Sequence, residues 1–297
     1  MNTGKKRILL TGGTGFLGSH MARALLEGGN EVVVLKRSFS RMDRLADVQA
    51  RLRFYDLDRG RLEEIIEECE PDVILHCATD YGRKDSDPLR IIEANLLLPL
   101  RLLYLTRRTK GAPMFINTDT ILDKRVSAYS LSKQQFKDWL ERFADERVCV
   151  NVALEHFYGP GDDPTKFVTF VIQALLRAEG HLDLTKGEQK RDFIYISDVV
   201  AAFMTLIGKA SEWGNGFYQY EVGSNEAVTV RRLVELVKEL TGNTETELRF
   251  GALPYRPNEV MEVRADTRSL RALGWESRID LETGLRLTIE EERRRME

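Results

Sequence analysis

A glycine-rich turn near the start of the chain constrains its fold more than any other feature. Residues 11–20 read Thr-Gly-Gly-Thr-Gly-Phe-Leu-Gly-Ser-His. The apolar run at 8–10 predicts a short buried strand, and apolar residues at helical spacing over 17–26 predict a helix. A strand, a glycine turn and a helix in this order are the context that a dinucleotide-binding loop requires.

The three glycines of this turn would have different tasks in such a loop. Gly12 allows a tight turn, Gly15 lets the backbone approach a pyrophosphate, and Gly18 lets the helix pack closely on the sheet. The N–H groups at the start of the helix then face the phosphates, helped by the helix dipole. The loop residues predicted to bind the cofactor are therefore Gly12, Thr14, Gly15, Phe16 and Leu17.

Length and composition limit the class of protein. A chain of 297 residues with 42% hydrophobic residues holds one large domain, or a main domain with a smaller partner. A net charge of −3 provides no general attraction to nucleic acid, and no apolar run reaches membrane-spanning length or forms a signal peptide. Three cysteines without metal-ligand spacing (Cys69, Cys77 and Cys149) indicate reduced thiols. We expect a cytoplasmic protein that binds neither nucleic acid nor membrane.

Strands and helices alternate along the first half of the chain. Such apolar strands must be covered on both faces, which predicts an α/β fold with a Rossmann-type, doubly wound parallel sheet. The expected strands are 8–10, 32–35, 52–57, 73–78, 114–118 and 148–154, and the helices between them include 62–68, 89–105 and 129–143.

The second half is less regular and contains most of the prolines. Helices are expected near 167–178, 198–209 and 230–241, with short strands between them. We predict a dinucleotide-binding domain over 1–160 and a smaller C-terminal substrate lobe over 161–297, with some segments of the latter returning to the first domain.

The end of the second strand bears on the choice of cofactor. Chains that bind NAD usually place Asp or Glu there to accept hydrogen bonds from the ribose hydroxyls. Here the strand continues into Lys36-Arg37-Ser38, and no carboxylate follows until Asp43. Arg37 and Ser38 would suit a 2′-phosphate, which predicts NADP(H). The alternatives are a solvated basic turn and NAD as cofactor.

Tyr129 and Lys133 are the pair best suited to chemistry. Four residues apart on a helix, they share a face, so the ammonium can approach the phenol. A nearby cation favours the phenolate and would lower the pKa of the tyrosine toward the working range. Thr118, at the end of the fifth strand, offers a hydroxyl to a substrate carbonyl or alcohol.

Together these motifs resemble the extended short-chain dehydrogenase/reductase family, whose members act on nucleotide sugars. The resemblance covers nearly the whole chain. The residues that carry it are the glycine turn, Asp56-Leu57, His76-Cys77-Ala78-Thr79, Asn95, Thr118, Tyr129, Lys133, Tyr158-Gly159-Pro160-Gly161 and residues 189–198.

The resemblance implies a role for each matched position. Asp56 and Leu57 would lie against the adenine, Ala78 and Thr79 would line the nicotinamide side, and Asn95 would belong to the cofactor site. Thr118, Tyr129 and Lys133 would be the catalytic residues, with Lys133 also bonding the nicotinamide ribose. Arg191 and Arg256 would bind the phosphates of a nucleotide-diphosphate sugar. The other expected substrate-binding residues are Asp80, Asp119, Thr120 and His156.

Departures from the family's patterns narrow the expected reaction. Dehydratases of the family carry Thr-Asp-Glu where this chain has Thr118-Asp119-Thr120, and the epimerase-reductases that make GDP-fucose place cysteine at Thr120 and histidine at Gly161. What remains is hydride transfer with Tyr129 as proton donor. The chain most resembles the branch that reduces C4 of a CDP-activated 4-keto-dideoxyhexose with NADPH.

Two other functions stay open. One is a C2- or C4-epimerase that holds NAD tightly, and the other is a non-catalytic dinucleotide-binding sensor. The short spacing from Thr118 to Tyr129, and His156 where the family usually has Asn, leave the substrate open. His76 and His156 have no suitably spaced second ligand, so we predict no metal site.

The helices at 89–103 and from Tyr129 carry more apolar residues than contact with one sheet requires. The second helix contributes Phe136, Trp139, Leu140 and Phe143. Paired across a two-fold axis, two such helices per subunit would form a four-helix interface, so we expect a homodimer. The alternative is that the second lobe covers the surplus face.

Overall fold

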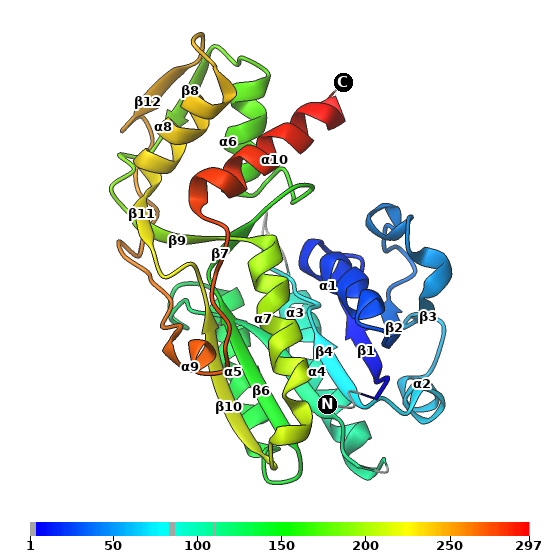
Figure 1. Ribbon diagram of the computed structural model, residues 1–297. Helices are drawn as coiled ribbons and strands as arrows, with labels where there is room; N and C mark the ends of the chain where they lie inside the picture. Colours follow the sequence, from blue (N-terminus) through cyan, green and yellow to red (C-terminus); the bar gives the residue numbers. More distant parts are fainter. Residues whose placement is uncertain (1–3, 83–86, 110, 297) are drawn as a thin grey trace. The chain divides into compact units, whose positions relative to one another are not determined.

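The computed structural model describes residues 4–82, 87–109 and 111–296 of the chain (Figure 1). The chain divides into two compact units, one formed by Met1–Ala153 with Val200–Tyr220 and the other by Leu154–Val199 with Glu221–Glu297. The expected α/β fold with a Rossmann-type sheet is confirmed, and smaller sheets are found in the C-terminal part of the chain.

The first unit is built on a seven-stranded sheet. The strand order is β10-β6-β5-β4-β1-β2-β3, and the pairs β2–β3, β1–β2, β1–β4 and β4–β5 are parallel. The order reverses between β1 and β4, and ligands of open α/β sheets bind at the carboxyl ends of strands beside such a point. The strands are β1 Arg7–Thr11, β2 Glu31–Lys36, β3 Arg53–Asp56, β4 Val73–His76, β5 Met114–Thr120, β6 Val148–Leu154 and β10 Gly216–Val222.

Helices cover both faces of this sheet. On one face, helices α2, α4 and α5 pack on the sheet and form a buried core with Leu9, Val33, Ile74 and Phe115. Helices α1 and α7 lie on the near side of the sheet in Figure 1. The helices are α1 Phe16–Glu27, α2 Leu62–Cys69, α3 Pro88–Ile92, α4 Leu98–Leu105, α5 Ala128–Arg142 and α7 Ile196–Gly208; the short turns are η1 Asp43–Leu45, η2 Gln49–Arg51, η4 Thr106–Arg108 and η5 Ala210–Glu212.

The single helix predicted over 89–105 is interrupted. A π-helical turn, η3 (Glu93–Leu97), separates α3 from α4, and Pro99 lies in the first turn of α4. Proline has no N–H to donate to the preceding turn, which explains why regular α-helical bonding is not continuous here.

Apolar side chains remain exposed on this helix layer. Phe136 and Leu140 of α5 are fully buried in the core, but Leu131 and Trp139 of the same helix are exposed. Leu97, in η3 against which α5 packs, is 41% exposed. The surplus apolar face noted in the sequence is therefore present in the folded chain.

The second unit contains two small sheets and a helical core. β9 pairs in parallel with β7 and antiparallel with β11, while β8 and β12 form a parallel pair. Helices α6, α8 and α10 contribute apolar side chains to one buried cluster with Phe193 of β9. The elements are β7 His156–Tyr158, β8 His181–Leu184, β9 Lys190–Tyr195, β11 Ala227–Thr229, β12 Glu247–Phe250, α6 Phe167–Leu176, α8 Val230–Thr241, α9 Arg268–Arg271 and α10 Leu281–Met296.

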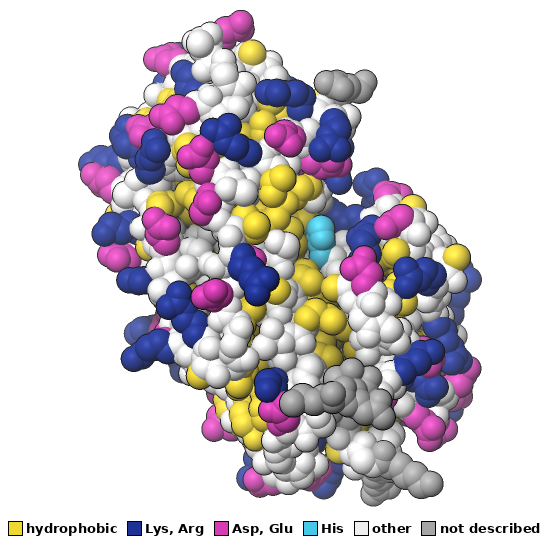
Figure 2. Space-filling view, in the orientation of Figure 1, with side chains coloured by type: hydrophobic (Ala, Val, Ile, Leu, Met, Phe, Trp, Pro, Cys, Tyr) yellow, Lys and Arg dark blue, Asp and Glu magenta, His cyan; other side chains and the backbone are white. Residues whose placement is uncertain are grey.

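Two surface properties bear on possible partners. Within the described residues, no helix has the length and apolar character to cross a membrane. Figure 2 shows acidic and basic side chains interspersed over the visible face, without a broad patch of one sign. The expected cytoplasmic location stays a prediction.

Candidate active site

The glycine turn joins β1 to α1 as the sequence predicts. Gly12 has a φ of +68°, and a Cβ atom there would lie 2.5 Å from the Ala78 backbone nitrogen, so this position requires glycine. Gly15 precedes α1 without a side-chain cap, which leaves the dipole and first-turn N–H groups of α1 as an anion-binding end. A Cβ on Gly18 would lie 2.1 Å from the Gly12 carbonyl oxygen. Gly18 therefore packs against the turn itself, rather than against the sheet as predicted.

Thr11 connects this turn to the end of β4. Its hydroxyl accepts a hydrogen bond from the Ala78 N–H (3.2 Å) and lies 2.8 Å from His76 Nδ1. Burial, together with the nearby Lys133 ammonium, lowers the pKa of the fully buried His76 well below its usual value. His76 is thus a neutral structural side chain that fixes the position of Ala78.

Thr79 provides a test of whether a dinucleotide fits here. Its hydroxyl is buried and has no hydrogen-bond partner among the described residues. A buried polar group is normally paired, so an unpaired hydroxyl beside the glycine turn suits a site that receives a polar ligand. Together with the close approach of Gly12 to Ala78, it fits the nicotinamide side predicted for Ala78 and Thr79.

Asn95 lies in the π-helical turn and bonds the loop after β4. Its side-chain oxygen accepts from the Asp80 N–H (2.8 Å), and its amide nitrogen donates to the Asp80 carbonyl (2.9 Å) and to the Ser132 hydroxyl (2.9 Å). Both amide hydrogens are therefore used within the protein. Asn95 thus connects Asp80 to Ser132 of α5, and its predicted place in the cofactor site stays a prediction.

Thr118, Tyr129 and Lys133 come together at the carboxyl end of β5. A capping box between Ser127 and Ser130 starts α5, which places Tyr129 in its first turn and Lys133 one turn later. The buried Lys133 ammonium donates to the Thr118 carbonyl oxygen (2.8 Å). The Thr118 hydroxyl donates to the His76 carbonyl oxygen (3.0 Å), so it can accept, but not donate, a further hydrogen bond in this orientation.

The protonation of Tyr129 differs from the expectation. Burial, the neighbouring Tyr81 and the Asp119 carboxylate raise the pKa of Tyr129 well above its usual value near 10. The predicted lowering by Lys133 is wrong, because its ammonium bonds the Thr118 carbonyl and burial acts directly on the phenol. Tyr129 is consequently a phenol at neutral pH, which is the form that can donate a proton.

Asp119 is held by a buried amide network. One carboxylate oxygen accepts from the Thr120 N–H (2.8 Å), and the other accepts from the Asn151 amide (2.6 Å). Asn151 also donates to Gln219 (3.0 Å) and accepts from Asn117 (2.7 Å). The network fixes the Asp119 carboxylate near the tyrosine and the lysine, and Asp119 raises the pKa of both.

Two carboxylates form hydrogen bonds with the basic turn Lys36-Arg37-Ser38 that follows β2. Asp58 accepts from Arg37 Nε (2.6 Å) and from the Ser38 N–H (2.8 Å), and Asp56 accepts from the Ser38 hydroxyl (2.8 Å). The turn predicted to lack a carboxylate therefore receives two from the end of β3. Leu57, predicted to contact adenine, lies between them, and its N–H donates to the Lys36 carbonyl oxygen (2.9 Å).

The predicted substrate residues His156, Arg191 and Arg256 belong to the second unit. Arg191 is buried and pairs with Glu259 (2.5 Å), which lies three residues after the exposed Arg256 in one turn. His156 Nδ1 lies 2.8 Å from the buried Glu155 carboxylate. His156 and Arg191 thus each have a carboxylate partner among the described residues.

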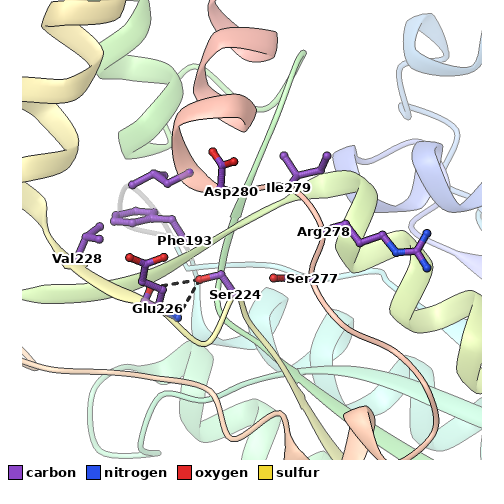
Figure 3. Close-up of a pocket in the computed structure, with 9 residues that line it drawn as sticks. Phe193, Ser224, Glu226, Val228, Ser277, Arg278, Ile279 and Asp280 are labelled. Carbon is purple, nitrogen blue, oxygen red and sulfur yellow. Dashed lines mark hydrogen bonds between the residues drawn. The ribbon is translucent and has the colours of Figure 1, made fainter.

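A separate pocket of about 180 Å³ lies within the second unit (Figure 3). Its lining includes Phe193, Ser224, Glu226 and Asp280. None of the predicted site residues lines it. The described residues also contain no group of three or more His, Cys, Asp or Glu side chains placed to hold a metal ion.

Residues 8–223 match the family described as the NAD dependent epimerase/dehydratase family. The CDP-abequose synthase of Salmonella typhimurium (strain LT2) is 32% identical over 294 residues, covering 95% of this chain and 96% of that protein. The chain belongs to the NAD dependent epimerase/dehydratase family. The family predicted from the sequence motifs is thereby confirmed.

Two UDP-glucose 4-epimerases and the protein MoeE5 are also similar to the chain. The UDP-glucose 4-epimerase of Mycolicibacterium smegmatis is 27% identical and covers 96% of this chain, which spans 97% of that protein. The solved structure of a UDP-glucose 4-epimerase with UDP-glucose from Thermotoga maritima has a TM-score of 0.85 at 28% identity, with 98% and 99% of the two chains covered. MoeE5 in complex with UDP-glucose and NAD has a TM-score of 0.82 at 26% identity, with 99% and 100% covered.

Several site residues escape the sequence analysis. Tyr81, whose ring centroid lies 5.1 Å from that of Tyr129, directly follows the predicted Asp80 and could have been included with it. Asp58, Asn151 and Glu259 act on predicted residues through contacts between distant segments. No local pattern marks these three.

Lys133 generates a prediction about stability. Burial lowers its pKa to about 8, although the Asp119 carboxylate and the Cys77 thiol act in the opposite direction. Between pH 8 and 10.5 the unfolded chain binds more protons than the folded chain, so this lysine makes stability rise with pH in that window. At neutral pH its charge costs roughly 3 kcal/mol.

We therefore expect Lys133→Met to raise the free energy of unfolding at pH 7 by about 2 kcal/mol. Removing the buried charge stabilises the fold by roughly 3 kcal/mol, and losing its hydrogen bond costs about 1 kcal/mol. The gain should shrink as the pH rises from 8 to 10.5. Urea unfolding without added dinucleotide measures it, with Lys137→Met on the same helix as the control for losing a lysine. A Lys133→Met variant less stable than wild type at pH 7 would contradict the expectation.

Proposed function

We propose that this protein uses NADPH to reduce the C4 keto group of a nucleotide-activated 4-keto-deoxyhexose, with a CDP-linked sugar as the first candidate. The observation that carries the proposal is the placement of Tyr129, a phenol at neutral pH, in the first turn of α5, one turn before Lys133, whose buried ammonium bonds the Thr118 carbonyl. Reduction of a ketone to an alcohol needs a proton at the carbonyl oxygen. The 32% identity to CDP-abequose synthase supports the substrate class.

Tyr129, Thr118 and Lys133 have separate roles in the proposed reduction. The reduced dinucleotide, when bound, supplies the hydride. Tyr129 holds the proton for the carbonyl oxygen at its phenolic oxygen, and the Thr118 hydroxyl can accept a hydrogen bond from the alcohol that forms. Lys133 holds the Thr118 carbonyl and would bond the nicotinamide ribose.

Cofactor and substrate would be held at several further positions. The turn around Gly12 and Gly15 would receive the pyrophosphate, and Asp56 and Leu57 would lie against the adenine. Arg191 and Arg256 bind the diphosphate of the sugar nucleotide, since guanidinium groups match phosphate oxygens in pairs. The remaining substrate contacts are assigned to Asp80, Asp119, Thr120 and His156.

Epimerisation with bound NAD is the second candidate. The Asp56 and Asp58 carboxylates beside Ser38 favour it, because a carboxylate at the adenosine ribose is typical of NAD sites. An epimerase would return the hydride and would not consume added NADPH. Purified protein that retains NAD absorbance would support this candidate.

Tyr129→Phe tests the proton donor. We expect the variant to fold and bind NADPH normally, but to lose at least about 100-fold in kcat, since a general acid is removed. The rate of NADPH oxidation with a CDP-activated 4-keto-dideoxyhexose measures the loss, and NMR of the sugar identifies the product. Tyr81→Phe, which keeps the ring beside Tyr129, is the matched control and should remain active. Near-normal turnover of Tyr129→Phe would move the proton donor elsewhere, with Asp119 the first residue to examine.

Arg37→Ala tests the preference for NADPH. Arg37 would contribute charge only toward a 2′-phosphate, so the variant should raise KM for NADPH and leave turnover with NADH nearly unchanged. Steady-state kinetics with both cofactors gives the ratio of kcat/KM values. A wild-type enzyme that prefers NADH would refute the assignment.

We also propose a homodimer formed through α5 and the helical segment that runs from α3 through η3 to α4. The exposed Leu97, Leu131 and Trp139 provide the apolar surface for such an interface. Light scattering should give twice the 34.1 kDa mass of one chain. Leu97→Glu should yield monomers, whereas Leu287→Glu, at an equally exposed leucine of α10, should not. A wild-type mass of 34.1 kDa would rule the dimer out.

A further inference from the structure

The turns that follow β2 and β3 bring opposite charges together. Parallel pairing sets Lys36 of β2 opposite Asp56 of β3, so the residues after each strand meet at the same edge of the sheet. Asp58 reaches across to Arg37 Nε (2.6 Å) and the Ser38 N–H (2.8 Å). The donors assigned above to a 2′-phosphate are thus already bonded to a carboxylate.

The position of Asp58 is defined by its own turn. Its N–H donates to the Asp56 carboxylate (3.0 Å), and the N–H groups of Arg59 and Gly60 donate to the Asp56 carbonyl oxygen (3.2 and 3.0 Å). The Asp56 carboxylate is occupied in turn by the Ser38 hydroxyl and by Lys36 Nζ (3.4 Å). Asp58 is therefore a fixed partner of the basic turn, and not a mobile surface charge that happens to lie near it.

The charges at this corner cancel in part. Lys36 and Arg59 both face Asp56 (3.4 and 3.8 Å), and Arg37 faces Asp58, so Arg37 does not present its full charge to an incoming anion. A 2′-phosphate carries a charge of about −1.5 to −2 at neutral pH and would have to compete with Asp58 for Arg37 and Ser38. A 2′-hydroxyl is uncharged and can donate a hydrogen bond to a carboxylate. Asp58 thus opposes the binding of a 2′-phosphorylated dinucleotide, but it can accept a hydrogen bond from the 2′-hydroxyl of NAD.

We propose that Asp58 is a specificity-determining residue, which limits the binding of 2′-phosphorylated dinucleotides by holding Arg37 and Ser38. The carboxylate that NAD-binding chains place at the end of the second strand is supplied here from the third strand. This inference rests on the proposed placement of the adenosine ribose at this corner, but not on the identity of the sugar or on the reaction.

Ligand fragments test the inference without turnover. Isothermal titration calorimetry of the full chain with adenosine 2′,5′-bisphosphate and with 5′-AMP compares the two ribose forms directly. Asp58→Asn, which keeps the shape of the side chain, should bind the bisphosphate about two- to fivefold more tightly, since Arg37 loses its charged partner and becomes available to the 2′-phosphate. Binding of 5′-AMP should change by less than about twofold, and the gain should fall at high salt.

Two further variants separate the possible outcomes. Asp43→Asn removes an exposed carboxylate that pairs with Arg41 (2.7 Å), and as the matched charge control it should leave both affinities unchanged. In Arg37→Ala/Asp58→Asn the gain should disappear, because Asp58 acts through Arg37. No gain in Asp58→Asn, or a gain that persists without Arg37, would overturn the inference. Failure of the proposed ketone reduction would appear in the Tyr129 assays and would leave these affinities as they are.

Discussion

A continuous series of hydrogen bonds organises the catalytic end of the sheet. Lys133 donates to the Thr118 carbonyl, the Thr118 hydroxyl donates to the His76 carbonyl, and the His76 ring contacts the Thr11 hydroxyl, which accepts from Ala78. The series ties α5, β5, β4 and β1 together at the point where the strand order reverses. The buried ammonium at its end is costly, and its neighbours offset that cost only in part. The fold thus accepts an unfavourable charge at the place where the proposed reaction needs one.

The parts of this structure that depend on local spacing are predictable from sequence. The glycine turn, the apolar strands and the Tyr129–Lys133 spacing each follow from neighbouring residues and physical rules of short range. The break in the helix at η3 is only partly of this kind, because Pro99 weakens the helix locally while Asn95 bonds a distant loop. The raised pKa of Tyr129 depends on burial and on Asp119, which no spacing rule supplies.

Paired arginines are the features that sequence describes least well. Arg37 and Arg191 each resemble phosphate ligands when met as single residues, yet each bonds a carboxylate from a distant part of the chain. Such a carboxylate fixes the guanidinium in a defined direction and also reduces the charge that it offers. The affinity of such an arginine for phosphate therefore depends on how well the phosphate competes with the carboxylate. The carboxylate partner can be identified only once the strands have been placed in the fold.

The late return of the chain to the first sheet has a consequence for folding. β6 is flanked by β5 on one side and by β10 on the other, and β10 comes from residues 216–222. During synthesis, residues 154–199 of the second unit are made before this strand exists. Until then β6, whose residues 149–152 become fully buried, presents an unpaired and apolar edge. The order of the chain thus imposes an interval in which a nascent molecule is open to strand exchange with its neighbours.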